Sequence, residues 1–176
     1  GFLGLERVRE WTDRGLMFAE AIEAVRAGGV FTTHTPVPAG IDRFPRDLFE
    51  PYFTQFADAL GIPFDELYAL GTRDDEPDGK FNMAVMGLRM AQRANGVSLL
   101  HGHVSRGMFA GLWSGFDSDD VPITSITNGV HAPTWVARRS PWTSKSAFGS
   151  RPSSPDTLSS APITIVTCSS KSTPSR

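Results

Sequence analysis

Hydrophobic and polar residues follow a helical period over residues 16–27, and the pattern changes immediately afterwards. The apolar members recur at intervals of three and four; they are Phe18, Ala21, Ile22 and Val25. This spacing predicts an amphipathic helix that ends at Gly28 and Gly29. Residues 30–33 are β-branched or aromatic and predict a short buried strand. A helix, a strand and a loop in this order predict an α/β unit.

Helical spacing recurs on both sides of this unit. Residues 2–11 predict a short helix, after which Asp13 is a candidate cap for the next one. Residues 46–60 predict a helix that stops at Gly61, and their aromatic side chains are expected to form core. Pro51 lies inside that helix and predicts a kink or a new first turn.

The middle of the chain predicts three more helices. Residues 63–70 form a short one. Asn82 is a good helix N-cap and begins a methionine-rich helix that extends to residue 94. Asn95 and Gly96 then separate it from a helix over residues 98–113.

Two groups of polar residues have the types of side chain that bind metals, but their spacing does not favour a metal site. Residues 71–80 contain several carboxylates without a histidine and are expected to form an exposed loop. His101 and His103 are two positions apart, so on one helix they point away from each other. We expect neither histidine to be a ligand, because chelation on a helix uses an i, i+4 pair.

His34 is the candidate functional residue of the first half. It directly follows the predicted strand, and Pro36, Pro38 and Gly40 make the chain after it a stiff, turned loop. Ligands of open α/β sheets bind beyond the carboxyl ends of the strands, so an imidazole at that position is a candidate site residue. The spacing alone fits a histidine satisfied by loop carbonyls equally well.

A second predicted strand, over residues 121–127, leads into Asn128 and Gly129. A strand followed by this dipeptide is a turn signal. From the dipeptide alone, Asn128 is favoured as a turn residue that tolerates positive φ.

Composition narrows the classes of function. The chain has 176 residues, a formal net charge of −2 and scattered arginines, so we expect neither nucleic acid nor an anionic membrane as a partner. No apolar run approaches the roughly 18 residues of a membrane span. Cys168 is the single cysteine, which favours a reducing compartment, and we expect a soluble, cytoplasmic protein. The chain begins with Gly1 rather than methionine, so we expect its true beginning to be missing.

Four blocks of sequence resemble a known family. They are FLGLERV from residue 2, FNMAVMGLR and RANGVSLLHG in the middle, and ITNGVHAPTW near residue 130, and a further stretch, TTHTPVPAGIDRFP from residue 32, lies between the first two. In this order they resemble the α-glucan (glycogen and maltodextrin) phosphorylases, particularly the short bacterial forms. The resemblance covers about residues 1–137.

The resemblance implies a fragment of a two-domain, Rossmann-like (GT-B type) glycosyltransferase, α/β in class and mostly helical in this piece. Residues 1–120 are then the C-terminal part of the N-terminal glucan-binding and catalytic domain, and residues 121–137 start the C-terminal cofactor domain. Residues 138–176 are dominated by Ser, Thr and Pro, with one strand-like island at residues 162–167. We expect this tail to be disordered or read out of frame, because the family continues with a charged helical stretch that is absent here.

The resemblance also implies a reaction, in which inorganic phosphate releases terminal α-1,4-glucosyl units as glucose 1-phosphate with pyridoxal phosphate as cofactor. By the resemblance, His34 and Asn128 both bind the glucosyl 6-hydroxyl, which donates to one and accepts from the other. His34 also has a catalytic role at the reacting end of the sugar. The implied partners are an α-1,4-glucan and inorganic phosphate. Dimers are common in the family, so a homodimer is one candidate assembly.

The cofactor residues of the family are not matched. The family attaches pyridoxal phosphate to a lysine far along its C-terminal domain, whereas the lysines here are Lys80, Lys145 and Lys171, in the acidic loop and the Ser-rich tail. None of them fits the Schiff-base role, so we expect this chain to be inactive alone. His103 stands after LHG, where the family usually has an acidic residue, which puts the role of that acid in doubt.

Two other classes of function stay open. A non-catalytic carbohydrate-binding or regulatory module derived from the family would keep His34 and Asn128 but would form a complete folded unit. A structural helical domain without catalytic descent would require the four blocks to match by chance.

Overall fold

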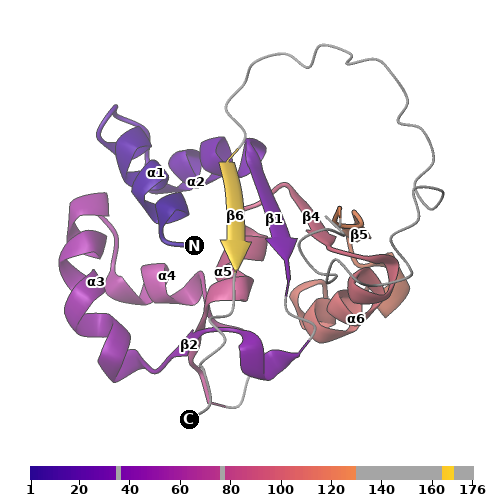
Figure 1. The fold of residues 1–176 in the computed structure, drawn as a ribbon. Coiled ribbons are helices and arrows are strands. Elements are labelled where there is room, and N and C mark those ends of the chain that lie inside the picture. Colours follow the sequence, from indigo (N-terminus) through magenta and orange to yellow (C-terminus); the bar gives the residue numbers. More distant parts are fainter. Residues whose placement is uncertain (35–36, 76–77, 130–163, 169–176) are drawn as a thin grey trace, which may run out of the picture. The chain divides into compact units, whose positions relative to one another are not determined.

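A computed structural model describes residues 1–34, 37–75, 78–129 and 164–168, which form a parallel sheet with helices packed on it (Figure 1). The helices are α1 (Leu3–Thr12), α2 (Phe18–Ala27), α3 (Arg46–Leu60), α4 (Phe64–Ala69), α5 (Met83–Arg89) and α6 (Leu99–Phe109), with 3-10 turns at Pro38–Gly40, Ala110–Leu112 and Ser118–Asp120. The strands are β1 (Gly29–Thr33), β2 (Arg43–Phe44), β3 (Phe81–Asn82), β4 (Arg93–Gly96), β5 (Ile123–Ser125) and β6 (Thr164–Cys168). The α/β class predicted from the sequence is confirmed.

The chain divides into two compact units. One comprises Gly1–Thr127 with Pro162–Arg176, and the other comprises Asn128–Ala161. The elements named above belong to the first unit. None of the helices in the described ranges is long and apolar enough to cross a membrane.

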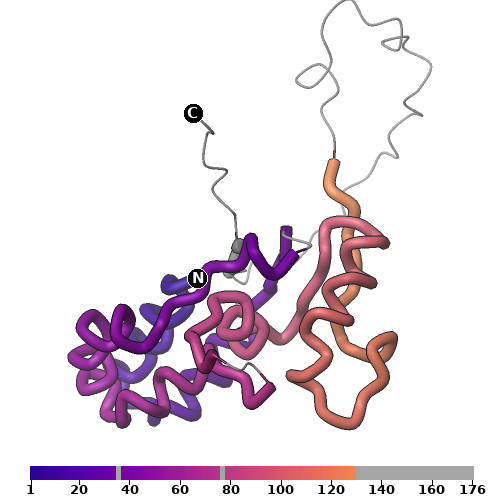
Figure 2. The backbone as a smooth tube through the Cα atoms, turned by 90° about the horizontal axis from the view of Figure 1, so that it is seen from below, coloured from indigo at the N-terminus to yellow at the C-terminus, as the bar shows by residue number. Residues whose placement is uncertain are grey.

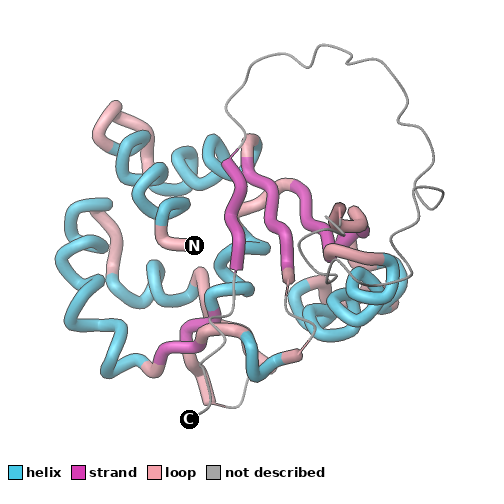
Figure 3. Tube along the Cα trace, in the orientation of Figure 1, coloured by secondary structure: helices cyan, strands magenta, loops and turns pink. Residues whose placement is uncertain are grey.

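Four parallel strands form the main sheet in the order β5-β4-β1-β6, and Figure 3 shows them side by side. Phe31 of β1 pairs with Ala94 of β4, which pairs with Ile123 of β5, and all three are buried in one core cluster. Side chains alternate along a strand, so Thr32 and its partner Asn95 occupy the opposite face. The apolar face therefore defines the register of the sheet.

Helices α5 and α6 cover that apolar face at close range. A Cβ at Gly87 of α5 would lie 2.5 Å from the Phe31 ring, and one at Gly96 would lie 2.7 Å from the backbone N of Gly102 in α6. Figure 2 shows α6 and β5, in the pink-to-orange range, running alongside each other. Glycine is thus needed where these helices contact the sheet.

A second core cluster joins helices α1 to α4 to the methionine side of α5. The aromatic residues of α3 form part of it, as predicted: the Phe49 ring stacks on Phe53 at 4.0 Å and on Phe81 at 4.1 Å between centroids. Tyr52 is the exception, with 75% of its surface exposed.

Several predicted helix boundaries are confirmed. Asn82 caps α5, because its Oδ1 accepts from the backbone N–H groups of Ala84 and Val85 at 3.0 and 3.3 Å. Gly61 ends α3 with a left-handed φ of 72°. Pro51, by contrast, neither divides α3 nor starts a new helix, since α3 is continuous through it.

Other predicted elements were wrong. The helix expected up to residue 94 ends at Arg89, and β4 follows as a strand. Residues 93–96 have weak strand preference, and their pairing between β1 and β5 overrides it. Asp13 does not cap the next helix: its carboxylate pairs with Arg9 at 2.6 Å, and Glu20 accepts from the Met17 N–H instead.

The prediction for the tail, residues 138–176, stays a prediction. Within the tail the structure describes residues 164–168, which overlap the strand-like island and pair in parallel with β1 as β6. The rest of residues 138–176 lies outside the described residues. The predicted boundary at residues 120 and 121 stays a prediction; β5, just beyond it, pairs with β4 in the main sheet.

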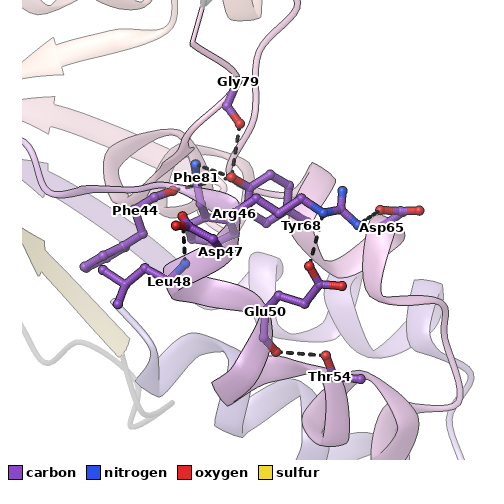
Figure 4. A network of polar contacts seen from close by, with 10 residues as sticks. All are labelled: Phe44, Arg46, Asp47, Leu48, Glu50, Thr54, Asp65, Tyr68, Gly79 and Phe81. Atoms are coloured by element: carbon purple, nitrogen blue, oxygen red, sulfur yellow. Dashed lines mark hydrogen bonds and ion pairs between the residues drawn. The ribbon is translucent and has the colours of Figure 1, made fainter.

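Tyr68 of α4 joins three elements through one buried hydroxyl (Figure 4). The hydroxyl accepts from the Phe81 N–H at 3.1 Å and donates to the Gly79 carbonyl at 3.1 Å, with the Phe44 carbonyl at 3.4 Å. Burial raises the pKa of Tyr68, and the Phe81 N–H opposes that rise. This hydroxyl thus connects α4 to the short ribbon that β2 and β3 form by antiparallel pairing.

Replacing Tyr68 with Phe should lower the free energy of unfolding by about 1–3 kcal/mol, because the Phe81 N–H loses a buried partner. The pKa of Tyr68 is raised in the folded protein. The protonated hydroxyl therefore stabilises the fold fully below the pKa of about 10 in the unfolded chain, and this stabilisation is lost as the pH rises through the folded pKa. Urea unfolding of the wild type and of Tyr68→Phe, at neutral pH and above pH ~10, measures how the free energy of unfolding of each protein changes with pH. An equal loss of stability with pH in both proteins would contradict the role of the hydroxyl.

Two helical glycines give a matched test of the packing of α5 on the sheet. Gly87→Ala should destabilise by about 1–3 kcal/mol, because the new methyl group meets the Phe31 ring. Gly107→Ala, in open space on α6, should stabilise by up to about 1 kcal/mol through helix propensity. A urea midpoint that rises in Gly87→Ala, as it should in Gly107→Ala, would contradict the close contact at Phe31.

Candidate functional site

The carboxyl ends of three strands meet at one edge of the main sheet. Thr33 at the end of β1 pairs with Gly96 at the end of β4, and Gly96 pairs with Ser125 at the end of β5. Because the strands are parallel, the segments that follow them leave from this same edge, which we name the carboxyl edge. In open α/β sheets it is the usual position of a ligand site.

His34 is the first residue beyond β1 at the carboxyl edge, as predicted. Its side chain is exposed, whereas Thr33 before it is only 2% exposed. The 3-10 turn Pro38–Gly40 follows, with the Ile41 N–H donating to the Pro38 carbonyl. Within the described part of the chain no hydrogen bond between a loop carbonyl and the His34 ring is found.

Helix α6 begins two residues after β4 and starts at the same edge. Ser98 caps it, with its hydroxyl oxygen accepting from the His101 N–H at 3.1 Å. The close contact of Gly96 with Gly102 sets the first turn of α6 directly against the sheet. The first two residues, Leu99 and Leu100, are 79% and 73% exposed.

The two histidines of α6 point apart, as predicted. His101 is 6% exposed, while the His103 side chain is 64% exposed and its Nδ1 lies 3.6 Å from Asp119 Oδ1. A polar contact this exposed contributes little to stability. Across the described ranges no group of three or more metal-ligating side chains is found.

A chain of hydrogen bonds at the carboxyl edge was missed by the sequence interpretation. The Thr32 hydroxyl donates to Asn95 Oδ1 at 3.0 Å, and the Asn95 amide nitrogen lies 3.4 Å from the Gly96 carbonyl. The same carbonyl accepts from the Ile126 N–H at 2.9 Å. Nothing in the sequence distinguishes Asn95 from a loop asparagine, since its partners come from distant segments.

Asn128 stands three residues beyond Ser125 in the sequence. It is exposed and is the first residue of the second unit. No non-glycine residue in the described ranges has a positive φ, so Asn128 does not adopt one, and its part in a turn stays a prediction. Its approach to His34 stays a prediction.

Lys80 does not fit a cofactor attachment role. Its Nζ lies 2.7 Å from Asp78 Oδ2, and both side chains are about 40% exposed in the loop before β3. A hydrogen bond donated by the Lys80 side chain holds the pKa of the Asp78 carboxyl below its usual value. Lys145 and Lys171 lie outside the described residues. Lys80 is the one lysine in the described part of the chain.

Comparison with known proteins identifies the relatives of this chain, although no protein-family model matches it. It is 62% identical over 144 residues to glycogen phosphorylase of Mycobacterium tuberculosis (strain H37Rv), a match that covers 78% of this chain and 16% of the relative. It is 41% identical over 135 residues to maltodextrin phosphorylase of Thermococcus litoralis, covering 77% and 16%. Glycogen phosphorylase of Aquifex aeolicus is 37% identical over 135 residues, covering 77% and 19%.

These identities relate the chain to the glucan phosphorylases. More particularly, the chain is homologous to one segment of the glycogen and maltodextrin phosphorylase family, as its four sequence blocks predict. It spans less than a fifth of the length of these relatives.

Proposed function

We propose that this chain is a fragment of a glycosyltransferase that phosphorolyses terminal α-1,4-glucosyl units of glycogen or maltodextrin. Its 62% identity to a glycogen phosphorylase supports this proposal most strongly. In the reaction, a phosphate oxygen bonds to C1 of the terminal glucose while the bond from C1 to O4 of the next glucose breaks. That O4 takes up the proton that the hydrogen phosphate loses, and glucose 1-phosphate is released.

His34 and Asn128 are the proposed substrate-binding residues. Both would bind the 6-hydroxyl of the terminal glucose, which can donate to one side chain and accept from the other. A sugar without this hydroxyl would leave a desolvated partner unpaired, at a cost of about 1–3 kcal/mol. The exposed position of His34 at the carboxyl edge supports its part of this role.

His34 also has a proposed catalytic role. Its backbone carbonyl would face the positive charge that develops at C1 as the glycosidic bond breaks. A fixed dipole aimed at developing charge stabilises a transition state without reorganisation. The turn Pro38–Gly40 that follows β1 supports such a fixed position.

The cofactor, the second domain and the assembly are proposals for the full-length protein. It would contain two Rossmann-like domains of the GT-B type, work in the cytoplasm and use pyridoxal phosphate bound by polypeptide outside this chain. A homodimer is the proposed assembly. Lys80, the one lysine in the described residues, pairs with Asp78.

A carbohydrate-binding module is the alternative, and one experiment separates it from the enzyme. The intact gene is expressed and supplied with maltooligosaccharide and phosphate, in parallel with residues 1–176 alone. We expect glucose 1-phosphate from the full-length protein and none from the fragment. Glucan binding by the full-length protein without glucose 1-phosphate would favour the module.

His34→Ala in the full-length protein should lower kcat/KM for glucose 1-phosphate, assayed in the direction of glucan synthesis, by about 10- to 100-fold. The variant should leave kcat/KM for 6-deoxyglucose 1-phosphate within a few-fold, since that substrate lacks the bonded hydroxyl. His103→Ala is the control, because that exposed histidine lies on α6 and should leave both values unchanged. Equal losses on both substrates in His34→Ala would refute the contact with the 6-hydroxyl.

A further inference from the structure

Asn95 is a buried amide in the middle of a parallel sheet. It is 5% exposed and lies on the face opposite the apolar residues Phe31, Ala94 and Ile123. Asparagine is a poor strand former, and a buried amide is costly unless it is hydrogen-bonded. A valine would suit a buried strand position better, so the amide calls for an explanation beyond packing.

The hydrogen bonds of Asn95 connect the ends of three strands. Its Oδ1 accepts from Thr32, two residues before His34, and its Nδ2 lies 3.4 Å from the Gly96 carbonyl at the end of β4. That carbonyl also accepts from the N–H of Ile126, the first residue after β5. The bonded chain thus runs across the carboxyl edge from β1 through β4 to β5.

We propose that Asn95 is a positioning residue for glucose recognition, an inference that rests on the proposed function. It fixes the end of β1 against the ends of β4 and β5, and so sets the position from which His34 meets the 6-hydroxyl. Hydrogen bonds weaken outside a narrow range of donor–acceptor distance, so the bond from Thr32 to Asn95 restrains β1 against β4. A displacement of about 1 Å at a reacting group can cost about 100-fold in rate, so such a restraint affects catalysis.

Two variants of the full-length protein remove the restraint. Thr32→Val replaces the donating hydroxyl with a methyl group of the same shape, and Asn95→Leu removes both amide contacts. The control is Thr124→Val: Thr124 pairs with Asn95 in the same row of the sheet, but its hydroxyl donates to the Ala94 carbonyl at 3.1 Å. Thr32→Val keeps the test valid where Asn95→Leu fails to fold.

The measured quantity is the ratio of kcat/KM for glucose 1-phosphate to kcat/KM for 6-deoxyglucose 1-phosphate. In Thr32→Val and Asn95→Leu we expect this ratio to fall by about tenfold, with the 6-deoxy value itself changed less than about twofold. Thr124→Val should keep the wild-type ratio.

Three other results would each contradict one part of the proposal. If Thr32→Val and Asn95→Leu lower kcat/KM by the same factor for both substrates, Asn95 has a structural role only and the positioning role is wrong. If Thr124→Val also lowers the ratio of the two kcat/KM values, the effect is not specific to the Thr32–Asn95 hydrogen bond, and the positioning role of Asn95 is wrong. A wild-type protein that does not discriminate between the two sugars would instead overturn the proposed contact with the 6-hydroxyl.

Discussion

The in-register parallel pairing of β1, β4 and β5 is the constraint on which the rest of the structure depends. Phe31, Ala94 and Ile123 share one row and one core, which fixes the register. A slip of one residue would turn these side chains to the opposite face. The same register brings three strand ends to one edge, so packing of the core also determines where His34 emerges.

Close contact of α5 and α6 with the sheet holds the carboxyl edge in a fixed position. Gly87 lets α5 lie against the Phe31 ring, and Gly96 lets the first turn of α6 lie against β4. Small residues at these points leave no room for either helix to tilt without opening a void. The Thr32–Asn95 hydrogen bond adds a polar link on the other face.

The sequence predicted the elements whose signals are local. The helical period of residues 16–27, the cap at Asn82 and the strand before His34 all depend on neighbours within a few positions, and all three are confirmed. Strand β4 was missed because its stability comes from pairing with segments about 30 to 60 residues away. The role of Asn95 was missed for the same reason, since its partner Thr32 lies 63 residues away.

The central claim is that one hydroxyl of glucose is bound from the carboxyl edge by an imidazole and an amide. A crystal structure of the full-length protein with glucose bound tests it most directly. We predict the glucose O6 within about 2.7–3.2 Å of both the His34 ring and the Asn128 side chain. A sugar bound with O6 in contact with neither residue, or bound at the amino ends of the strands, would contradict the account.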